Sequence, residues 1–170
     1  MGEMQVREAL AGEHEGLGSL IQRAYAEYAR PGDPLWDGYF SMLADVAGRA
    51  AFATVLVAVA GGHVIGTATV ELDTTIEGTQ DLQPGQANFR LLAVDPPARG
   101  HGAGGRLVQA CIQVARTAGK HVATLHTTDQ MAAAQRIYRS LGFERDPPRD
   151  IDLSPHLILR AFRLPLLPPD

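Results

Sequence analysis

The sequence has little of three features that mark particular classes of protein: cysteine, an excess of basic residues and long apolar runs. One cysteine, Cys111, cannot form a disulfide within the chain, and we expect a reducing, cytoplasmic location. The net charge of -4 argues against nucleic acid as a partner. The longest apolar stretch, around residues 55–60, is too short to span a bilayer, and no signal peptide is evident, so we expect no membrane partner.

Helical and extended patterns follow one another along a chain of 170 residues, the length of one domain, 1–170. They predict a mixed α/β layer structure. The expected helices lie within 7–29 and over 36–49, 104–118 and 129–141. The expected strands cover 54–60, 63–72, 87–94, 121–127, a short segment from Phe143, and 157–166, with a loop over 73–86.

A glycine-rich turn joins the strand that ends at Val94 to the helix that follows. It reads Arg99-Gly100-His101-Gly102-Ala103-Gly104-Gly105. Glycine lets backbone N–H groups approach a ligand closely, and N–H groups at a helix N-terminus favour an anion. The segment therefore predicts a binding site for a diphosphate.

Three kinds of diphosphate site fit such a turn to different degrees. A nucleotide P-loop needs a lysine followed by serine or threonine, which this turn lacks. Gly100, Gly102 and Gly105 match a dinucleotide fingerprint, but two prolines separate them from the strand and too few residues follow for a doubly wound sheet. The third kind is a coenzyme A pyrophosphate loop, and Arg99, Gly102 and Gly104 resemble the signature of a family that has such a loop.

A second motif lies downstream, where residues 134–143 read Ala-Gln-Arg-Ile-Tyr-Arg-Ser-Leu-Gly-Phe. The two motifs together resemble the GNAT (GCN5-related N-acetyltransferase) superfamily over nearly the whole chain. The resemblance implies a central, mostly antiparallel sheet flanked by helices. It also implies an acyltransferase that moves the acetyl group of acetyl-CoA, bound as co-substrate, to a primary amine.

The resemblance further implies which residues hold the coenzyme. The strand before the glycine-rich turn would carry a bulge and splay from its neighbour, leaving backbone groups for pantetheine and an N–H of Leu92 or Val94 for the thioester carbonyl. Tyr138 would protonate the departing thiolate as general acid. The implied coenzyme-binding residues are Leu92, Ala93, Val94, Arg99, Gly100, His101, Gly102, Ala103, Gly104 and Gly105.

Two positions depart from the family pattern. Asn88 stands where many relatives have a glutamate that acts as base, and Met131 stands where asparagine is common. The candidates for a replacement base are His126, Glu71 and Asp73. Cys111, on the apolar side of its expected helix, is expected to pack rather than react, and no metal site is expected.

The acceptor stays open at this point, whether a small-molecule or a peptide amine. Trp36, Tyr39 and Phe40 are expected either to line the acceptor site or to pack in the core. The charged residues Arg145, Asp146, Arg149 and Asp150 suggest a solvated loop, and an edge strand such as the last one leaves a homodimer open. The alternative functions are a non-catalytic acyl-CoA-binding module (a sensor or partner subunit) and, last, a dinucleotide oxidoreductase.

Overall fold

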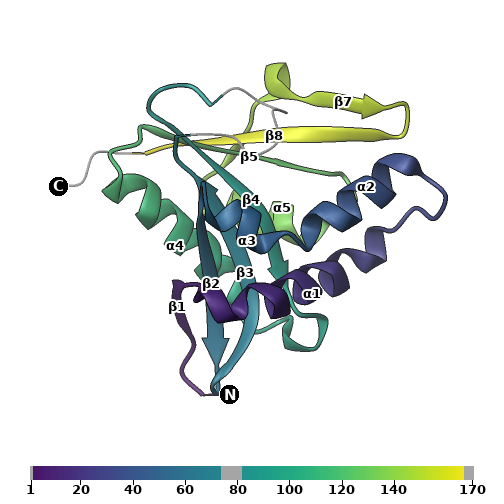
Figure 1. Cartoon of the computed structure of the whole chain (residues 1–170). Helices are drawn as coiled ribbons and strands as arrows, with labels where there is room; N and C mark the ends of the chain where they lie inside the picture. The colour runs from purple at the N-terminus through teal and green to yellow at the C-terminus, as the bar shows by residue number, and fades with distance from the viewer. Residues whose placement is uncertain (1, 74–81, 167–170) are drawn as a thin grey trace.

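A twisted sheet forms the centre of the molecule in a computed structural model that describes residues 2–73 and 82–166 (Figure 1). The sheet order is β1-β2-β3-β4-β5-β8-β6, with β7 paired to β8. Its strands are antiparallel except for the pair β4 and β5. The strands are β1 Gln5–Glu8, β2 Thr54–Ala60, β3 His63–Glu71, β4 Gln86–Val94, β5 Val122–Thr127, β6 Glu144–Arg145, β7 Ile151–Ser154 and β8 Leu157–Pro165.

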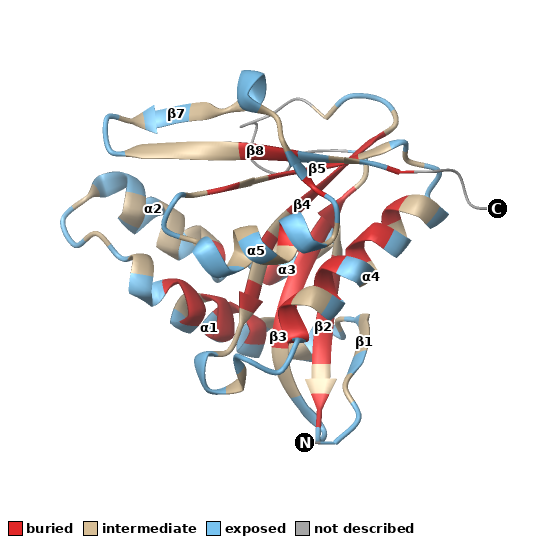
Figure 2. Cartoon of the chain, turned by 180° about the vertical axis from the view of Figure 1, so that it is seen from behind, coloured by how far each residue is buried: buried red, intermediate tan, exposed pale blue. Residues whose placement is uncertain are grey.

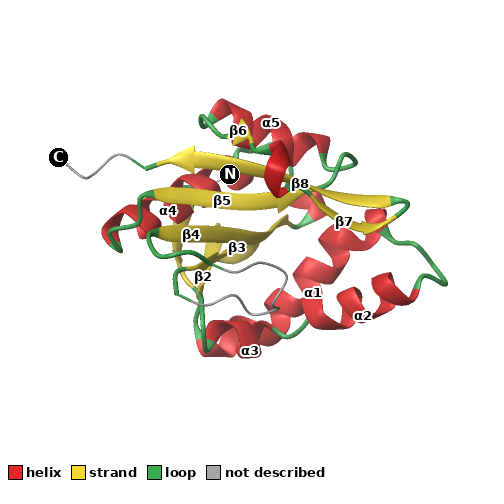
Figure 3. Ribbon diagram, turned by 90° about the horizontal axis from the view of Figure 1, so that it is seen from above, coloured by secondary structure: helices red, strands yellow, loops and turns green. Residues whose placement is uncertain are grey.

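Helices cover both faces of the sheet and divide the core in two. One face packs against α4 and α5, and the other against α1 and α3, with α2 packed on α1. Figure 2 shows the buried sides of α1 and α4 turned toward the strands, and Figure 3 shows α1, α2 and α3 on the side opposite α5. The helices are α1 His14–Tyr25, α2 Pro34–Leu43, α3 Val46–Ala50, α4 Ala103–Thr117 and α5 Ala132–Ser140, with 3-10 turns η1 Ala11–Glu13, η2 Ala26–Tyr28, η3 Pro96–Ala98 and η4 Pro147–Arg149.

The expected mixed α/β fold, with a mostly antiparallel sheet between helices, is confirmed, but several elements differ. Strands β1 and β7 were missed, because each is four residues long and is defined by its partner strand rather than by its own pattern. The helix expected over 36–49 is two helices, since the Asp45 side chain accepts a hydrogen bond from Gly48 N and starts α3. Most of the loop expected over 73–86 lies outside the described residues.

The last strand is not the edge strand that was expected. It pairs with β5 on one side and with β6 and β7 on the other, so β8 lies inside the order of the sheet. None of the helices in the described part of the chain is long and apolar enough to cross a membrane.

Strand β4 carries a bulge that reverses the faces of its side chains. Thr67 pairs with Ala93 but Thr69 pairs with Arg90, so β4 has one extra residue at this point, and Leu91 adopts a φ of 53°. Before the bulge Ala87 and Phe89 join the core under α4, whereas afterwards Leu91 and Ala93 join the core under α1. A one-residue insertion produces this exchange because side chains alternate between faces of a strand.

The bulge coincides with the point where β4 and β5 separate. Their parallel pairing covers only Gln86–Phe89 and Val122–Leu125, and beyond it the two strands have no ladder bonds to each other. One backbone carbonyl in this part of β4 has a hydrogen-bond donor outside the sheet, since the Tyr25 hydroxyl donates to Leu92 O at 3.1 Å. Burial, followed by the neighbouring tyrosines, raises the pKa of Tyr25, so this donor stays protonated.

We predict that Tyr25→Phe destabilises the fold while leaving its apolar packing in place. The substitution would leave Leu92 O without its donor, at a cost of about 1–2 kcal/mol in the free energy of unfolding. Urea denaturation measures this, with Tyr138→Phe as the matched control, because the Tyr138 hydroxyl has no hydrogen-bond partner within residues 2–73 and 82–166. Equal stabilities of the two variants would contradict the proposed role of Tyr25 at the bulge.

Candidate active site

The glycine-rich turn presents open backbone at the N-terminus of α4. Gly100 and Gly102 have φ values of 84° and 85°, which favour glycine, and Gly102 is the N-cap residue. A Cβ at Gly100, Gly102 or Gly105 would meet no atom within 4 Å, so a ligand can approach this surface. The first N–H groups of a helix have no partner within it, and α4 has no acidic residue in its first turn to repel an anion.

Arg99, the first residue of the turn, is held by the N-terminal part of the chain. Its guanidinium pairs with Glu27 at 2.7 Å and donates to Ala24 O at 3.1 Å and Val94 O at 3.4 Å. These contacts fix the turn against α1 and η2. His101 is exposed, and its Nδ1 lies 3.4 Å from Ala98 O, so it supports the turn through the backbone.

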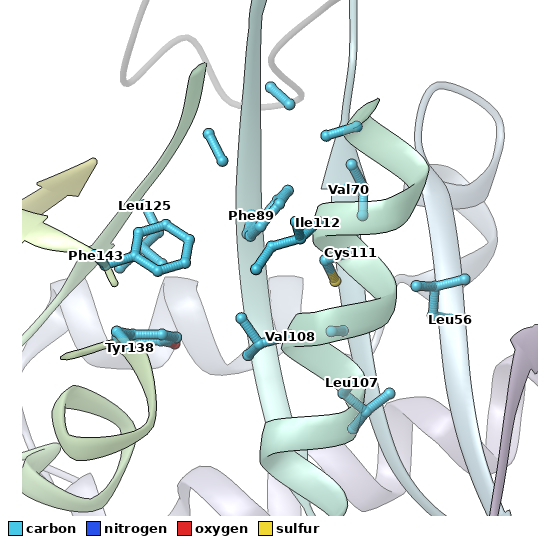
Figure 4. Packing of buried hydrophobic residues seen from close by; sticks show 14 of the residues in the cluster. Leu56, Val70, Phe89, Leu107, Val108, Cys111, Ile112, Leu125, Tyr138 and Phe143 are labelled. Carbon is cyan, nitrogen blue, oxygen red and sulfur yellow. The ribbon is translucent and has the colours of Figure 1, made fainter. Parts of the chain in front are cut away.

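Gly104 has a packing role. A Cβ at this position would lie 2.8 Å from Ile137 Cδ1, so the absence of a side chain lets α5 approach α4 closely. This contact places Tyr138 beside α4. Figure 4 shows the Tyr138 ring next to Phe143, with its hydroxyl directed toward Val108 of α4. The motif over residues 134–143 thus brings a phenol to the separated end of β4.

The Tyr138 side chain is 7% exposed and lies among apolar residues. Burial, with a smaller effect of Cys111, raises the pKa of Tyr138 above its usual value of 10.0. The phenol is therefore protonated at neutral pH and can donate a proton or a hydrogen bond. Burial likewise raises the pKa of the Cys111 thiol to about 12, which suppresses the thiolate that a nucleophile would need.

Two hollows meet where β4 and β5 separate. The smaller one, about 40 Å³, lies beside α4 and α5 and is lined in part by Leu92, Cys111 and Tyr138. The larger one, about 320 Å³, lies between α2 and the β7–β8 hairpin. The residues common to both linings are Tyr25, Phe89, Arg90, Leu91, His126, Thr127 and Met131.

The three candidate bases occupy different environments. His126 lines both hollows, and its Nε2 lies 2.9 Å from Arg149 O. A carbonyl only accepts, so Nε2 carries a proton and Nδ1 is the acceptor of the neutral ring. Glu71 is fully buried, lines neither hollow, and pairs with Arg90 at 3.4 Å. Asp73 also lies outside both linings and pairs with Lys120.

The two departures from the family pattern lie at the meeting point or near it. Asn88 lines the larger hollow, and its Nδ2 donates to Glu71 Oε1 at 3.4 Å. The carboxylate that the Asn88 position lacks is therefore supplied beside it by β3, since Glu71 pairs with Asn88 across the strands. Met131 is the N-cap residue of α5, and it lines both hollows.

Of the three aromatic residues expected at an acceptor site, two lie in the wall of the larger hollow. Trp36 and Tyr39 line it, whereas Phe40 packs behind them with its ring centroid 5.8 Å from that of Trp36. No sequence pattern indicated the opposite wall, which the β7–β8 hairpin builds from Ile151, Leu153, Leu157 and Leu159. Within the described residues, no group of three His, Cys, Asp or Glu side chains could hold a metal ion.

An ion-pair network fixes the hairpin wall, which corrects the expected solvated loop. Asp150 accepts two hydrogen bonds from Arg145, at 2.7 and 2.8 Å, one from Arg160 and one from Ala161 N. Arg160 also pairs with Asp129 at 2.9 Å. Hydrogen bonds from Arg145 are the main reason why the pKa of Asp150 lies well below its usual 3.8.

We predict that Asp150→Asn loosens the hairpin and lowers the free energy of unfolding by about 1–3 kcal/mol at neutral pH. Because the pKa of Asp150 is lower in the folded state than in the unfolded state, where it is near 4, the carboxylate stabilises the fold above about pH 4. This contribution is lost as the pH falls. The difference in the free energy of unfolding between wild type and variant should therefore shrink below about pH 4. Denaturation across this pH range tests it, with the exposed residue Asp152 mutated to Asn as control. A constant difference would contradict the role of the charge.

Comparison with known proteins agrees with the architecture of the site. The sequence model of the acetyltransferase (GNAT) family matches residues 15–143. The structure of yncA from Salmonella typhimurium, a proposed acetyltransferase solved with its cofactor acetyl-CoA, is 25% identical over 99% of both chains, with a TM-score of 0.70. No curated protein sequence matches the chain.

More distant structures share the fold. PaiA N-acetyltransferase from Thermoplasma acidophilum, in complex with coenzyme A, is 14% identical over 96% of this chain and 99% of its own, with a TM-score of 0.73. The ribosomal-protein-S18-alanine N-acetyltransferase from Escherichia coli is 17% identical over 99% and 97%, with a TM-score of 0.69. The fold and site define an acyltransferase-like α/β protein. The family match is specific, and the chain belongs to the acetyltransferase (GNAT) family.

Proposed function

We propose that this protein is an N-acetyltransferase that binds acetyl-CoA at the turn 99–105 and passes the acetyl group directly to a primary amine. The observation that carries the proposal is the meeting of two hollows where β4 and β5 separate. A coenzyme arm on the α4 side and an acceptor on the α2 side would then reach one point. Holding two reactants together in this way supplies a large part of a catalytic effect.

The parts of the coenzyme would contact different parts of the chain. The pyrophosphate would lie on the N–H groups at the start of α4, around Gly102, Ala103 and Gly105. The pantetheine amides would pair with the backbone of Leu92, Ala93 and Val94, which β5 leaves uncovered. Arg99 would contribute by holding the turn, since its guanidinium is committed to Glu27 and α1.

In the reaction the neutral amine attacks the thioester carbonyl carbon, and an N–H of Leu92 or Val94 stabilises the oxyanion. The carbon–sulfur bond then breaks, and Tyr138 transfers its proton to the sulfur. A proton leaves the attacking nitrogen for water or for Nδ1 of His126, the one candidate base that lines both hollows. Glu71 acts on this site only by holding Arg90 and Asn88.

A second function, binding acyl-CoA without catalysis, is favoured by one observation. Asn88 cannot accept a proton, and the neighbouring Glu71 is buried in an ion pair. Such a sensor or partner subunit would bind acetyl-CoA but release no free thiol with any amine. The Tyr138 phenol in the lining of the smaller hollow supports the enzyme instead, because a module that only binds has no need of a proton donor beside the sulfur.

We predict that Gly105→Glu weakens coenzyme A binding about tenfold or more, because it adds a negative charge beside the pyrophosphate. Gly105 suits this test better than Gly102, since a side chain there meets nothing within 4 Å and needs no positive φ. Gly105→Gln is the matched uncharged control. Calorimetric titration with CoA measures the affinity, and equal affinities of the Glu and Gln variants would place the pyrophosphate elsewhere.

We predict that Tyr138→Phe lowers turnover about 10²–10⁴-fold and leaves the affinity for acetyl-CoA nearly unchanged, because the ring stays and only the acid is lost. Thiol release in the presence of a reactive amine measures turnover, and protection against thermal unfolding measures binding. Unchanged turnover with a good acceptor would remove Tyr138 as the general acid.

A further inference from the structure

The larger hollow has two apolar walls of different kinds. One wall is aromatic: Tyr28, Tyr25, Tyr39 and Trp36 follow one another in that order with ring centroids 6.0 to 6.3 Å apart. The other wall is the aliphatic face of the β7–β8 hairpin. Two leucines at this hollow, Leu35 and Leu153, are 55% and 42% exposed. Large exposed apolar side chains that line a concavity are typical of a binding site for an apolar ligand.

The charged residues described in this lining already have hydrogen-bond or ion-pair partners within the protein. Arg30 donates to His156 O at 3.2 Å, and Arg90 pairs with the buried Glu71. Asp33, the one carboxylate among the described residues of the lining, accepts from Leu35 N at 3.0 Å and caps α2. A polyamine or aminoglycoside would place several ammonium groups against two arginines and one committed carboxylate, which is an unfavourable match of charge.

The size and closure of the hollow also favour a small molecule. Its volume of about 320 Å³ lies at the lower end of the range of small-ligand pockets. The bond from Arg30 to His156 joins the segment before α2 to the β7–β8 turn, so the two walls are tied together. An extended peptide needs an open groove, whereas a compact body fits between tied walls.

We propose that the acceptor is a primary amine on a short link to one aromatic body, which lies between Trp36 and Leu153. This inference rests on the proposed function and specifies its acceptor. The amine would reach the junction beside His126 and Met131, while the body fills the larger hollow. A free arylalkylamine and an aromatic amino acid share this chemistry and differ only in a carboxylate.

The chain contains a built-in probe of this pocket, because Trp36 is its only tryptophan. The protein would be titrated with 2-phenylethylamine, L-phenylalanine, spermidine and a lysine peptide, with excitation where phenyl rings do not absorb. Thiol release from acetyl-CoA would be measured with the same four amines. Trp36→Phe removes the signal and confirms its source.

We predict that one or both aromatic amines change the Trp36 emission and are acetylated with kcat/KM at least about tenfold above spermidine and the peptide, the factor expected from burying an apolar body. Comparison of kcat/KM for 2-phenylethylamine and L-phenylalanine shows whether the site accepts the carboxylate of an amino acid. Leu153→Ser should weaken aromatic amine binding about tenfold, since it removes part of the apolar wall. Phe52→Ser, an exposed aromatic outside the lining, is the matched control and should bind as wild type.

The outcomes separate the acceptor class from the catalytic proposal. Acetylation of spermidine or the peptide in preference to the aromatic amines would overturn the acceptor class and leave the acetyltransferase standing. Binding of an aromatic amine without thiol release would support the acceptor class and overturn catalysis. Absence of any change in Trp36 emission with both aromatic amines would overturn the acceptor class by itself.

Discussion

The separation of β4 from β5 after Phe89 is the constraint on which the rest of the site depends. A sheet normally satisfies its own backbone, and a strand that leaves its partner exposes N–H and C=O groups that need other partners. Here the bulge at Leu91 turns the strand, and Tyr25 satisfies one carbonyl from α1. The uncovered backbone that remains is what a ligand with amide groups would use.

Packing around this gap explains why distant parts of the chain must cooperate. Gly104 lets α5 approach α4, which brings Tyr138 to the gap from one face, while Arg99 ties the turn to α1 on the other. The hairpin wall depends in turn on Asp150, which holds two arginines and the backbone of β8. Each contact joins segments far apart in sequence, so the site forms only when the sheet is complete.

Local patterns were enough to predict the core strands and both motif helices, because β-branched runs and 3.6-residue periodicity act over short distances. They could not predict β1 and β7, whose hydrogen bonds come from a partner strand, nor the break at Asp45, which depends on one side-chain cap. The turn proposed to bind the coenzyme was visible as glycines before a helix. The pairing of Arg99 with Glu27 and the hairpin wall of the larger hollow were not, since no sequence pattern links residues that only tertiary structure brings together.

The ion pair of Glu71 with Arg90 bears on the kind of acceptor that the site can use. A carboxylate buried behind the hollows must be paired, and Arg90 pairs with Glu71, so the charge of Glu71 is already compensated inside the protein. The larger hollow instead presents apolar walls, and transfer into such surroundings disfavours the charged form of an amine. Desolvation by Trp36 and the hairpin would therefore help to deliver the neutral nucleophile that attack on the thioester requires. A site that obtains its nucleophile in this way needs an acceptor with enough apolar surface to offset the loss of hydration of the amine.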